Sequence, residues 1–388
     1  MIVRLFLLLC GPLSVAALAA TRPAAGGGFG AAAKASSVVV VDASPTIARL
    51  RDFLKQNKAD VDHVQVGDAT THGRGLFARK SFTKQGKIIC KIPSDCALAL
   101  SDPAAQGKDV PTVAHNGANF LKLYLQDSAK RAQWAPYLET LPTEAGVSAT
   151  PDFLADEEIG LLEFPPLVKA VRERKEQIAQ VATAQGYSVG EVQFASWLVS
   201  SRSFPLAVSA DEEDAAKDDE GVAVPSIEVD DRGQVLAKAD RAYIRVMLPW
   251  LDMANHDSNA PNARITILDP HKEAAWFALE VLRPIQKGQE ILVAYGSGVD
   301  SSVELLQNYG FVPEKNRMDY LMLRHLHQQA EKDPTVQDFP LAAYATSLEE
   351  DEKLLAMAKE ENEPNLTKIL AFRVQLKQSY PSVNGDNA

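Results

Sequence analysis

The sequence predicts an α+β fold in which a β-rich domain is split by a helical insertion and followed by a small all-α lobe. Three observations carry this prediction. Short strand-like runs punctuated by glycine occupy residues 63–97 and return from residue 241. Between them, residues 112–205 repeat apolar side chains at helical spacing. The same spacing returns after Pro313, in what we expect to be a separate lobe.

The first 43 residues are typical of a targeting segment. Residues 1–20 place Arg4 before an apolar run that ends in small residues, the pattern of a cleaved secretory signal. The next stretch is rich in Ala, Gly and Ser and has no acidic residue before Asp42, as in a transit peptide. The two together predict import into a plastid through the secretory route, whereas a signal alone would predict secretion. No second apolar stretch of spanning length follows, so we expect a soluble mature protein with no membrane partner.

Composition excludes several classes of function. The chain has 388 residues, 46% of them hydrophobic, which is enough for a substantial core. Its net charge of −11 offers no broad basic field, so nucleic acid is not an expected partner. Of three cysteines, Cys10 lies in the targeting segment, and Cys90 and Cys96 make no disulfide framework. No CxxC or HExxH spacing appears, so we expect no metal.

Individual elements follow from local patterns. Ser44-Pro45 starts a helix whose apolar residues Ile47, Leu50 and Leu54 share one face. Strands are predicted in GLFARKSF, GKIICKIP, RAYIRVMLP, NARITIL, AAWFALEVL and EILVAYG.

Helices are predicted in FLKLYLQ, PPLVKAVRERKEQIAQVATAQ and VGEVQFASWLVSSRSF, within an insertion at about 101–205. The acidic run at about 209–222 is predicted to be a solvated loop, with an acidic docking site as the alternative. YLMLRHLHQQAEK, SLEEDEKLLAMAKEEN and LTKILAFRVQLKQSY predict a helical C-terminal lobe at 313–388.

Three short motifs invite a chemical interpretation, and each also has a structural one. Gly73-Arg74-Gly75 is read locally as a β-turn between strands, and alternatively as a turn that approaches a ligand closely. It lacks the third glycine of a dinucleotide-binding loop and does not open a helix. The local pattern of the Asn-His pair in DMANHD, residues 252–257, indicates a hydrogen-bonded turn or a hydrogen-bonded histidine at the end of a strand. Tyr295 lies at the end of a predicted strand, where a tyrosine usually packs against its neighbours.

Taken in order, four segments resemble the SET-domain methyltransferases, in the branch of Rubisco large-subunit lysine methyltransferase and actin-histidine methyltransferase. They are HGRGLFA at 72–78, SSRSF at 200–204, LPWLDMANHDSN at 248–259 and AYGSGVDSSVELLQNYGF at 294–311. The resemblance covers about residues 45–380. It implies a SET domain at 44–312, closed by a pseudoknot in which the Tyr309-Gly310-Phe311 segment threads under a loop of the preceding chain, and a C-terminal lobe that binds the protein substrate.

The resemblance also implies the site. Tyr295 aligns with the family's catalytic tyrosine, and S-adenosylmethionine is the methyl donor. Cofactor-binding roles are implied for His72, Gly73, Arg74, Gly75, Arg202, Asn255, His256, Tyr295 and Phe311. Substrate-binding roles are implied for Arg202, Phe204, Asp252, Tyr295 and Tyr309. Without the resemblance, an Arg-Ser-Phe helix end is ordinary capping and packing.

The chain departs from its relatives in two places. Ser302 and Val303 precede Glu304 where relatives commonly carry Asn, which puts one cofactor-side contact in doubt. The C-terminal lobe is also shorter than in well-known relatives, so substrate recognition is expected to differ. The cysteine cluster that follows many histone-modifying SET domains is absent, as in the Rubisco-type branch.

The expected activity is methyl transfer to a side-chain nitrogen, most simply lysine, of a plastid protein. Rubisco large subunit, fructose-bisphosphate aldolase or another stromal protein are the candidate substrates, and a monomer is expected. Two alternatives stay open: a protein-histidine methyltransferase, and a catalytically silent SET module that binds a partner. A secreted hydrolase is not supported, because neither GxSxG nor a paired-histidine motif occurs.

Overall fold

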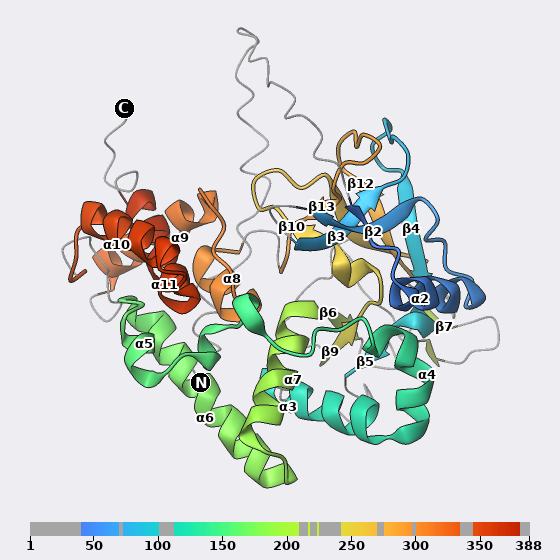
Figure 1. The fold of residues 1–388 in the computed structure, drawn as a ribbon, viewed down its shortest axis with the longest axis horizontal. Coiled ribbons are helices and arrows are strands. Elements are labelled where there is room, and N and C mark those ends of the chain that lie inside the picture. The colour runs from blue at the N-terminus through green and yellow to red at the C-terminus, as the bar shows by residue number, and fades with distance from the viewer. Residues whose placement is uncertain are drawn as a thin grey trace, which may run out of the picture. The chain divides into compact units, whose positions relative to one another are not determined.

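Runs of strands and runs of helices follow one another along the chain in the order that the sequence predicts (Figure 1). The structure is a computed structural model, and it describes residues 40–69, 73–100, 112–208, 216–217, 223–224, 242–269, 275–296, 300–333 and 344–380. All of these belong to one compact unit, residues 37–388. The predicted targeting segment, residues 1–43, lies outside the described residues up to position 39.

One antiparallel sheet contains the first glycine motif. Strands β1 (Val40–Val41), β2 (Val64–Ala69) and β3 (Gly73–Ala78) follow one another in that order. The β-turn predicted at Gly73–Gly75 is wrong, because these residues form the first half of β3 and pair with the end of β2. Of these three residues, only Gly73 has a left-handed backbone, with φ of 70°.

Two further sheets join strands from either side of the helical insertion. Strand β4 (Ile88–Pro93) pairs with β12 (Trp276–Val281), which also pairs with β11 (Ala263–Leu268). In the other sheet, β9 (Ala242–Met247) lies between β5 (Leu98–Ala99) and β6 (Ser203–Val208). The split β-rich domain predicted from the sequence is therefore one body of strands, interrupted only in chain order. A fourth, parallel pair joins β10 (Asn255–His256) to β13 (Leu292–Val293).

Helix α2 (Pro45–Gln56) forms as predicted. Ser44 Oγ accepts the Ile47 N–H at 3.3 Å, and proline at the first helical position needs no hydrogen-bond partner for its nitrogen. The apolar residues Ile47, Leu50 and Leu54 are all buried in the main core. Burying that face is what holds the helix to the domain, since a helix of this length is marginal in water.

The insertion is helical, as expected, but ends earlier. Its main elements are α3 (Val113–Phe120), the π-helical η4 (Leu121–Gln126), α4 (Ser128–Leu138), α5 (Asp156–Gly160), α6 (Pro165–Gln185) and α7 (Val189–Arg202), with short 3-10 turns at Gly146–Ser148 and Pro151–Phe153. Residues 203–205, predicted as the end of the insertion, begin strand β6 instead. Residues 101–111 lie outside the described residues.

The predicted acidic loop lies largely outside the described residues. Within 209–222 the structure describes only β7 (Ala216–Lys217), which pairs antiparallel with β8 (Ala223–Val224). Both are two-residue strands, so neither the solvated loop nor the docking site is tested.

A second hydrophobic core joins the C-terminal helices to the insertion. After α8 (Ser302–Tyr309) the chain forms α9 (Arg317–Lys332), α10 (Leu348–Glu360) and α11 (Pro364–Ser379), drawn in orange to red in Figure 1. Apolar residues of α6, α8 and α11 pack together, among them Leu167, Val171, Val303, Leu306, Ile369, Phe372 and Leu376. Helix α8 also contacts α7, so it connects the C-terminal helices to the elements around the candidate site.

The described helices include none that combines the length and apolar character needed to cross a membrane. Cys90 and Cys96 are both buried and unbonded. Burial raises the pKa of both thiols, that of Cys96 to about 11.

Candidate active site

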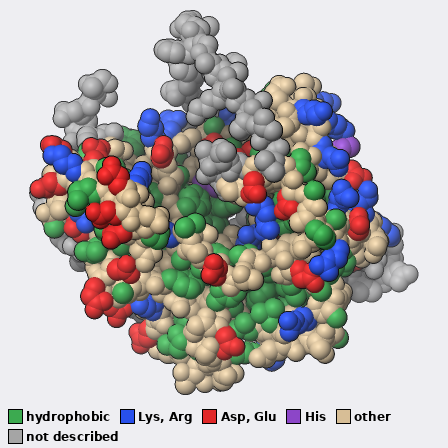
Figure 2. All heavy atoms as spheres, in the orientation of Figure 1, with side chains coloured by type: hydrophobic (Ala, Val, Ile, Leu, Met, Phe, Trp, Pro, Cys, Tyr) green, Lys and Arg blue, Asp and Glu red, His purple; other side chains and the backbone are tan. Residues whose placement is uncertain are grey.

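A narrow pocket brings together segments that are far apart in the sequence. With the solvent at its mouth it encloses about 310 Å³, and its lining comprises Ser201, Arg202, Ser203, Phe204, Leu251, Asp252, Ala254, Val293, Tyr295, Gly296 and Tyr309. These residues come from the end of α7, the start of β6, the turn before β10, the end of β13 and the end of α8. In Figure 2, hydrophobic side chains gather around a hollow near the centre of the face shown.

Tyr295 is fixed by two hydrogen bonds. Its hydroxyl donates to the Ala254 carbonyl at 2.8 Å, and its backbone N–H donates to Nδ1 of His256 at 2.8 Å. Burial raises the pKa of the Tyr295 phenol well above its usual value of 10, with the Arg202 cation opposing. The hydroxyl therefore stays protonated at neutral pH.

Three aromatic rings lie against this tyrosine. Ring centroids lie 4.7 Å apart for Tyr295 and Tyr309, 5.0 Å for Tyr295 and His256, and 6.2 Å for Tyr295 and Phe311. His256 and Phe311 are 5.5 Å apart. Tilted contacts at these spacings are favourable between rings and make the wall stiff and apolar.

His256 is held as a neutral ring. Because Nδ1 accepts the Tyr295 N–H, it carries no proton, and Nε2 faces Ser258 Oγ at 2.6 Å as the donor. Burial lowers the pKa of His256 to about 4, against a smaller opposing effect of Asp257. A proton on Nδ1 would break the bond that positions the Tyr295 backbone.

Asn255 meets the glycine motif. Its Nδ2 donates to the Arg74 carbonyl at 3.2 Å and to Glu290 Oε1 at 2.8 Å. A Cβ added at Gly75 would lie 2.6 Å from Asn255 Nδ2 and 2.7 Å from Glu290 Oε1. Glycine at position 75 is therefore required by the close approach of this amide.

A buried ionic group lies on one side of the pocket. Asp252 Oδ2 accepts from Arg202 Nη1 at 3.2 Å and from the Tyr137 hydroxyl at 2.7 Å. Burial lowers the pKa of Arg202, but the Asp252 carboxylate outweighs it and the net pKa is raised. Burial, followed by repulsion from Arg202, lowers the pKa of Arg74, whose Nη2 donates to the Thr140 carbonyl at 2.7 Å. Arg74 and Arg202 thus share the electrostatic influence of Asp252, and Asp42 and Asp68 act on Arg74 as well.

A further cation lies near Tyr309. Arg245 Nη1 donates to Ser203 Oγ at 3.2 Å, and burial lowers the pKa of this guanidinium. Burial raises the pKa of Tyr309 to about 12, with Asp300 adding to the rise and Arg245 opposing it. Arg245 forms no ion pair with any residue that the structure describes.

The structure brings together most of the residues that the sequence singled out. Arg202, Phe204, Asp252, Tyr295 and Tyr309 line the one pocket. The rings of His256 and Phe311 contact Tyr295, and His256 also accepts the Tyr295 N–H. Asn255 precedes His256 and contacts Arg74 and Gly75. A Cβ at Gly73 would meet nothing within 4 Å. His72 lies outside the described residues.

Sequence patterns missed four residues of the site. Tyr137, Glu290, Arg245 and Ser203 are bonded to it from positions where the local pattern indicates only packing or solvent. No short motif marks Tyr137, Glu290 or Arg245, and Ser203 lies within the SSRSF segment without having been assigned a role. The positions that depart from the family pattern have structural roles: Ser302 donates from its N–H and its Oγ to Asp319, both at 2.6 Å, and Val303 is buried in the second core.

Within the described ranges, no group of three or more His, Cys, Asp or Glu side chains has the arrangement to hold a metal ion.

The chain is similar to known proteins over most of its length. Residues 73–296 match the family model described as SET domain. Ribosomal lysine N-methyltransferase 4 of Saccharomyces cerevisiae is 24% identical over 62% of this chain and 49% of its own length. The chain thus spans about half the length of that curated relative.

Among solved structures, the SET domain of LSMT bound to lysine and AdoHcy matches with a TM-score of 0.58 and 13% identity, covering 89% of this chain and 91% of that one. Rubisco LSMT bound to AdoMet matches with a TM-score of 0.56 and 13% identity, covering 88% and 91%. At this identity the likeness concerns the fold.

Proposed function

Because the chain belongs to the SET-domain family, we propose that it is a protein methyltransferase that uses S-adenosylmethionine to methylate a lysine side chain of another protein. One observation carries the proposal. Tyr295 lies in a narrow aromatic pocket, where its hydroxyl donates to the Ala254 carbonyl and its backbone N–H donates to His256. These bonds bring the tyrosine together with the Asn255–His256 strand and the end of α8. The lysine methyltransferase activity named for the yeast relative agrees with this proposal.

The pocket favours the reactive form of a lysine. A lysine attacks an electrophilic carbon only as the neutral amine, and reaching that form at pH 7 costs about 4.6 kcal/mol from a reference pKa of about 10.4. The rings of Phe204, Tyr295 and Tyr309 exclude water and disfavour an ammonium ion. The Arg245 cation, which has no ion pair among the described residues, acts in the same direction, because like charges repel. Deprotonation then needs no dedicated base and proceeds through water.

Tyr295 is assigned to positioning. Its raised pKa makes the phenolate rare, so the hydroxyl cannot serve as a strong base. Held at 2.8 Å from the Ala254 carbonyl, it fixes one side of the channel and orients the amine by hydrogen bonding. Alignment of two reacting groups supplies a large share of the rate in such a reaction.

The residues present fit the methyl donor, which supplies an electrophilic methyl group on a sulfonium. Arg74 and Arg202 bring two guanidinium groups to this side of the pocket, which suits the carboxylate of the donor's amino-acid portion. The donor would be held by the residues implied above, from the glycine motif His72, Gly73, Arg74 and Gly75 to Arg202, Asn255, His256, Tyr295 and Phe311. Asp252 would shape the side of the pocket that receives the target, together with Phe204 and Tyr309.

Calorimetric titration with S-adenosylmethionine tests the proposal first. Micromolar-range binding with a thermal shift is expected, and a silent SET module that only binds a partner predicts neither. Incubation with labelled S-adenosylmethionine and a stromal extract, followed by mass spectrometry, identifies the modified residue. Methyl-lysine supports the proposal. Methyl-histidine would support the histidine alternative, for which deprotonation costs little because imidazole is mostly neutral near pH 7.

We propose a plastid location for this activity, with Rubisco large subunit, fructose-bisphosphate aldolase or another stromal protein as substrate, and a monomeric enzyme. The support is the pattern of residues 1–43 described above. Fusing residues 1–43 to a fluorescent protein, in a cell whose plastid is reached through the secretory route, tests it. Fluorescence in the plastid is the expected result, and fluorescence in the medium would favour secretion.

A further inference from the structure

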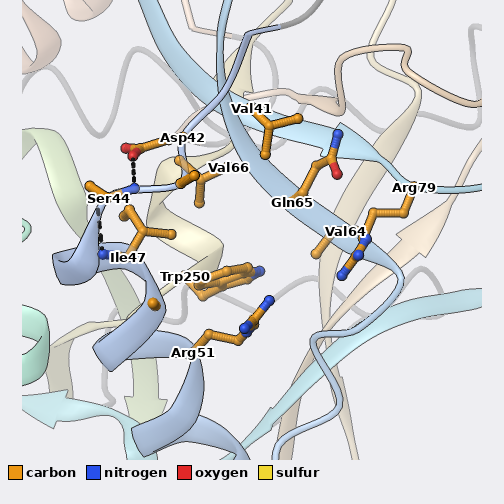
Figure 3. Close-up of a pocket in the computed structure, with 12 residues that line it drawn as sticks. Val41, Asp42, Ser44, Ile47, Arg51, Val64, Gln65, Val66, Arg79 and Trp250 are labelled. Carbon is orange, nitrogen blue, oxygen red and sulfur yellow. Dashed lines mark hydrogen bonds between the residues drawn. The ribbon is translucent and has the colours of Figure 1, made fainter.

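A second pocket lies between helix α2 and the first half of strand β2, and none of its lining residues lines the candidate active-site pocket (Figure 3). With the solvent at its mouth it encloses about 640 Å³. Without that solvent the cavity volume is about 240 Å³, just below the range of about 300–1,000 Å³ that is typical of pockets that hold small molecules. The lining residues are Val41, Asp42, Ala43, Ser44, Ile47, Ala48, Arg51, Val64, Gln65, Val66, Arg79 and Trp250.

One side of this pocket is apolar. Ile47, Val64, Val66 and Trp250 are buried, and Val41 is 48% exposed at the rim. Such a wall favours the hydrocarbon part of a ligand, because burying apolar surface is favourable in proportion to its area.

The other side is rich in hydrogen-bond donors, with the Gln65 amide beside them. Figure 3 shows the guanidinium groups of Arg51 and Arg79 on the side toward which the indole nitrogen of Trp250 points. Trp250 is 1% exposed, and its Nε1 has no hydrogen-bond partner among the residues that the structure describes. A buried donor without an acceptor is costly and rare in folded proteins. A ligand oxygen would satisfy it after a small movement of the side chains that line the pocket.

Nearby carboxylates leave the two arginines available. Asp42, at the far side of the pocket in Figure 3, accepts the N–H of Ser44, the residue that caps α2, at 2.9 Å. Asp62 is bonded to Lys55 at 2.9 and 3.0 Å, and the Arg51 and Arg79 cations contribute less than Lys55 to the lowered pKa of this carboxyl. The contact of Arg51 with its neighbour Asp52 is 3.9 Å long, and the Arg51 side chain is 41% exposed. Among the described residues, Arg79 has no ion pair.

We propose that this pocket binds a small organic anion with an apolar body, its carboxylate or phosphate monoester group lying between Arg51, Arg79 and the Trp250 indole. Oxyanions accept hydrogen bonds from both guanidinium groups and from an indole N–H, and charge-assisted bonds of this kind are the stronger ones. Neither a cation nor a neutral apolar ligand would satisfy this set of donors.

Calorimetry on the full chain tests the site with four probes: octanoate, octyl phosphate, octan-1-ol and inorganic phosphate. Octanoate or octyl phosphate is expected to bind and to raise the melting temperature, and the tighter of the two identifies the head group. Octan-1-ol lacks the charge and phosphate lacks the tail, so both are expected to bind at least about tenfold more weakly, as for the loss of a charged hydrogen bond.

Variants separate the site from unspecific binding. Arg51→Gln combined with Arg79→Gln should weaken the tighter probe at least about tenfold. Arg131→Gln, an exposed arginine on α4, should leave binding unchanged. Trp250→Phe should weaken binding severalfold while keeping an aromatic ring. Because position 250 has a φ of 77° and lies in the core, that variant can fail to fold, whereas the arginine variant changes only partly exposed side chains.

Three results would overturn the proposal. They are equal affinity in the double arginine variant, binding of octan-1-ol as tight as that of octanoate, and no binding of either anionic amphiphile at millimolar concentration.

Discussion

Replacing Asp252 by Asn should destabilise the protein far more than its small change in shape suggests. The Asp252 side chain is fully buried, and its Oδ2 is the shared acceptor for Arg202 at 3.2 Å and Tyr137 at 2.7 Å. The amide keeps the volume but removes the negative charge. Arg202, 20% exposed, then stays in a poorly solvated position with Arg74 as a like-charged neighbour.

The expected loss is about 3 kcal/mol in the free energy of unfolding. Breaking a buried ion pair by removing one partner costs about 3–5 kcal/mol, and the partial exposure of Arg202 places this pair at the low end. Tyr137→Phe removes one hydrogen bond to the same oxygen and should cost about 1.5–2 kcal/mol.

Urea unfolding at pH 7.5 measures both variants, with Asp156→Asn as the control. Asp156 pairs with Lys175 at 2.7 Å, yet its side chain is 77% exposed, so solvent screens the pair and the midpoint should not move measurably. If Asp252→Asn shifts the midpoint no more than this control, the carboxylate does not neutralise Arg202 and the electrostatic account of the site is wrong.

Three further predictions concern glycine and histidine. Gly75→Ala should weaken S-adenosylmethionine binding at least about tenfold in calorimetry, because its Cβ would lie 2.6 Å from Asn255 Nδ2; unchanged affinity would remove Asn255 from the donor site. Gly310→Ala should cost at least about 1 kcal/mol in urea unfolding, because position 310 has a φ of 77° and an added Cβ would collide with the Ser148 carbonyl; a smaller loss would mean that the contact yields. His256 has a pKa of about 4 in the folded protein and an ordinary pKa of 6.5, so the unfolded chain binds the proton more readily. The free energy of unfolding should therefore fall as pH drops from about 6.5 toward 4. The loss down to pH 5 should be below about 2 kcal/mol, because the ring is only partly buried. His256→Asn should flatten this part of the stability profile, and an equally steep profile would contradict the assignment.

Local patterns predicted the elements well where burial has a clear period. Ile47, Leu50 and Leu54 identified one face of α2, and that face is the buried one. Ser44 marked the start of the same helix through a side-chain bond that reaches only three residues ahead. Information of this kind is contained within one or two turns of chain, so a single sequence reveals it.

The glycine motif shows where local patterns mislead. Glycine usually marks a turn, yet Gly75 lies in a strand and is needed because Asn255 approaches from 180 residues further along the chain. Tyr137 and Asp252 are 115 positions apart, and nothing around Tyr137 distinguishes it from a packing residue of α4. Contacts across such separations depend on how the sheets assemble. Most site residues could be predicted only because four segments occur in the order that is typical of the family.

Tyr295 is proposed to position the reacting groups for methyl transfer. The direct measurement is the rate of labelled methyl transfer from S-adenosylmethionine into protein by wild type, Tyr295→Phe and Tyr187→Phe, the last removing an exposed hydroxyl bonded to Gln126. Loss of the Tyr295 hydroxyl should lower the rate about hundredfold, the scale of a misplaced reactant, with donor affinity nearly unchanged. Tyr187→Phe should retain the full rate. Equal labelling by wild type and Tyr295→Phe would contradict the account.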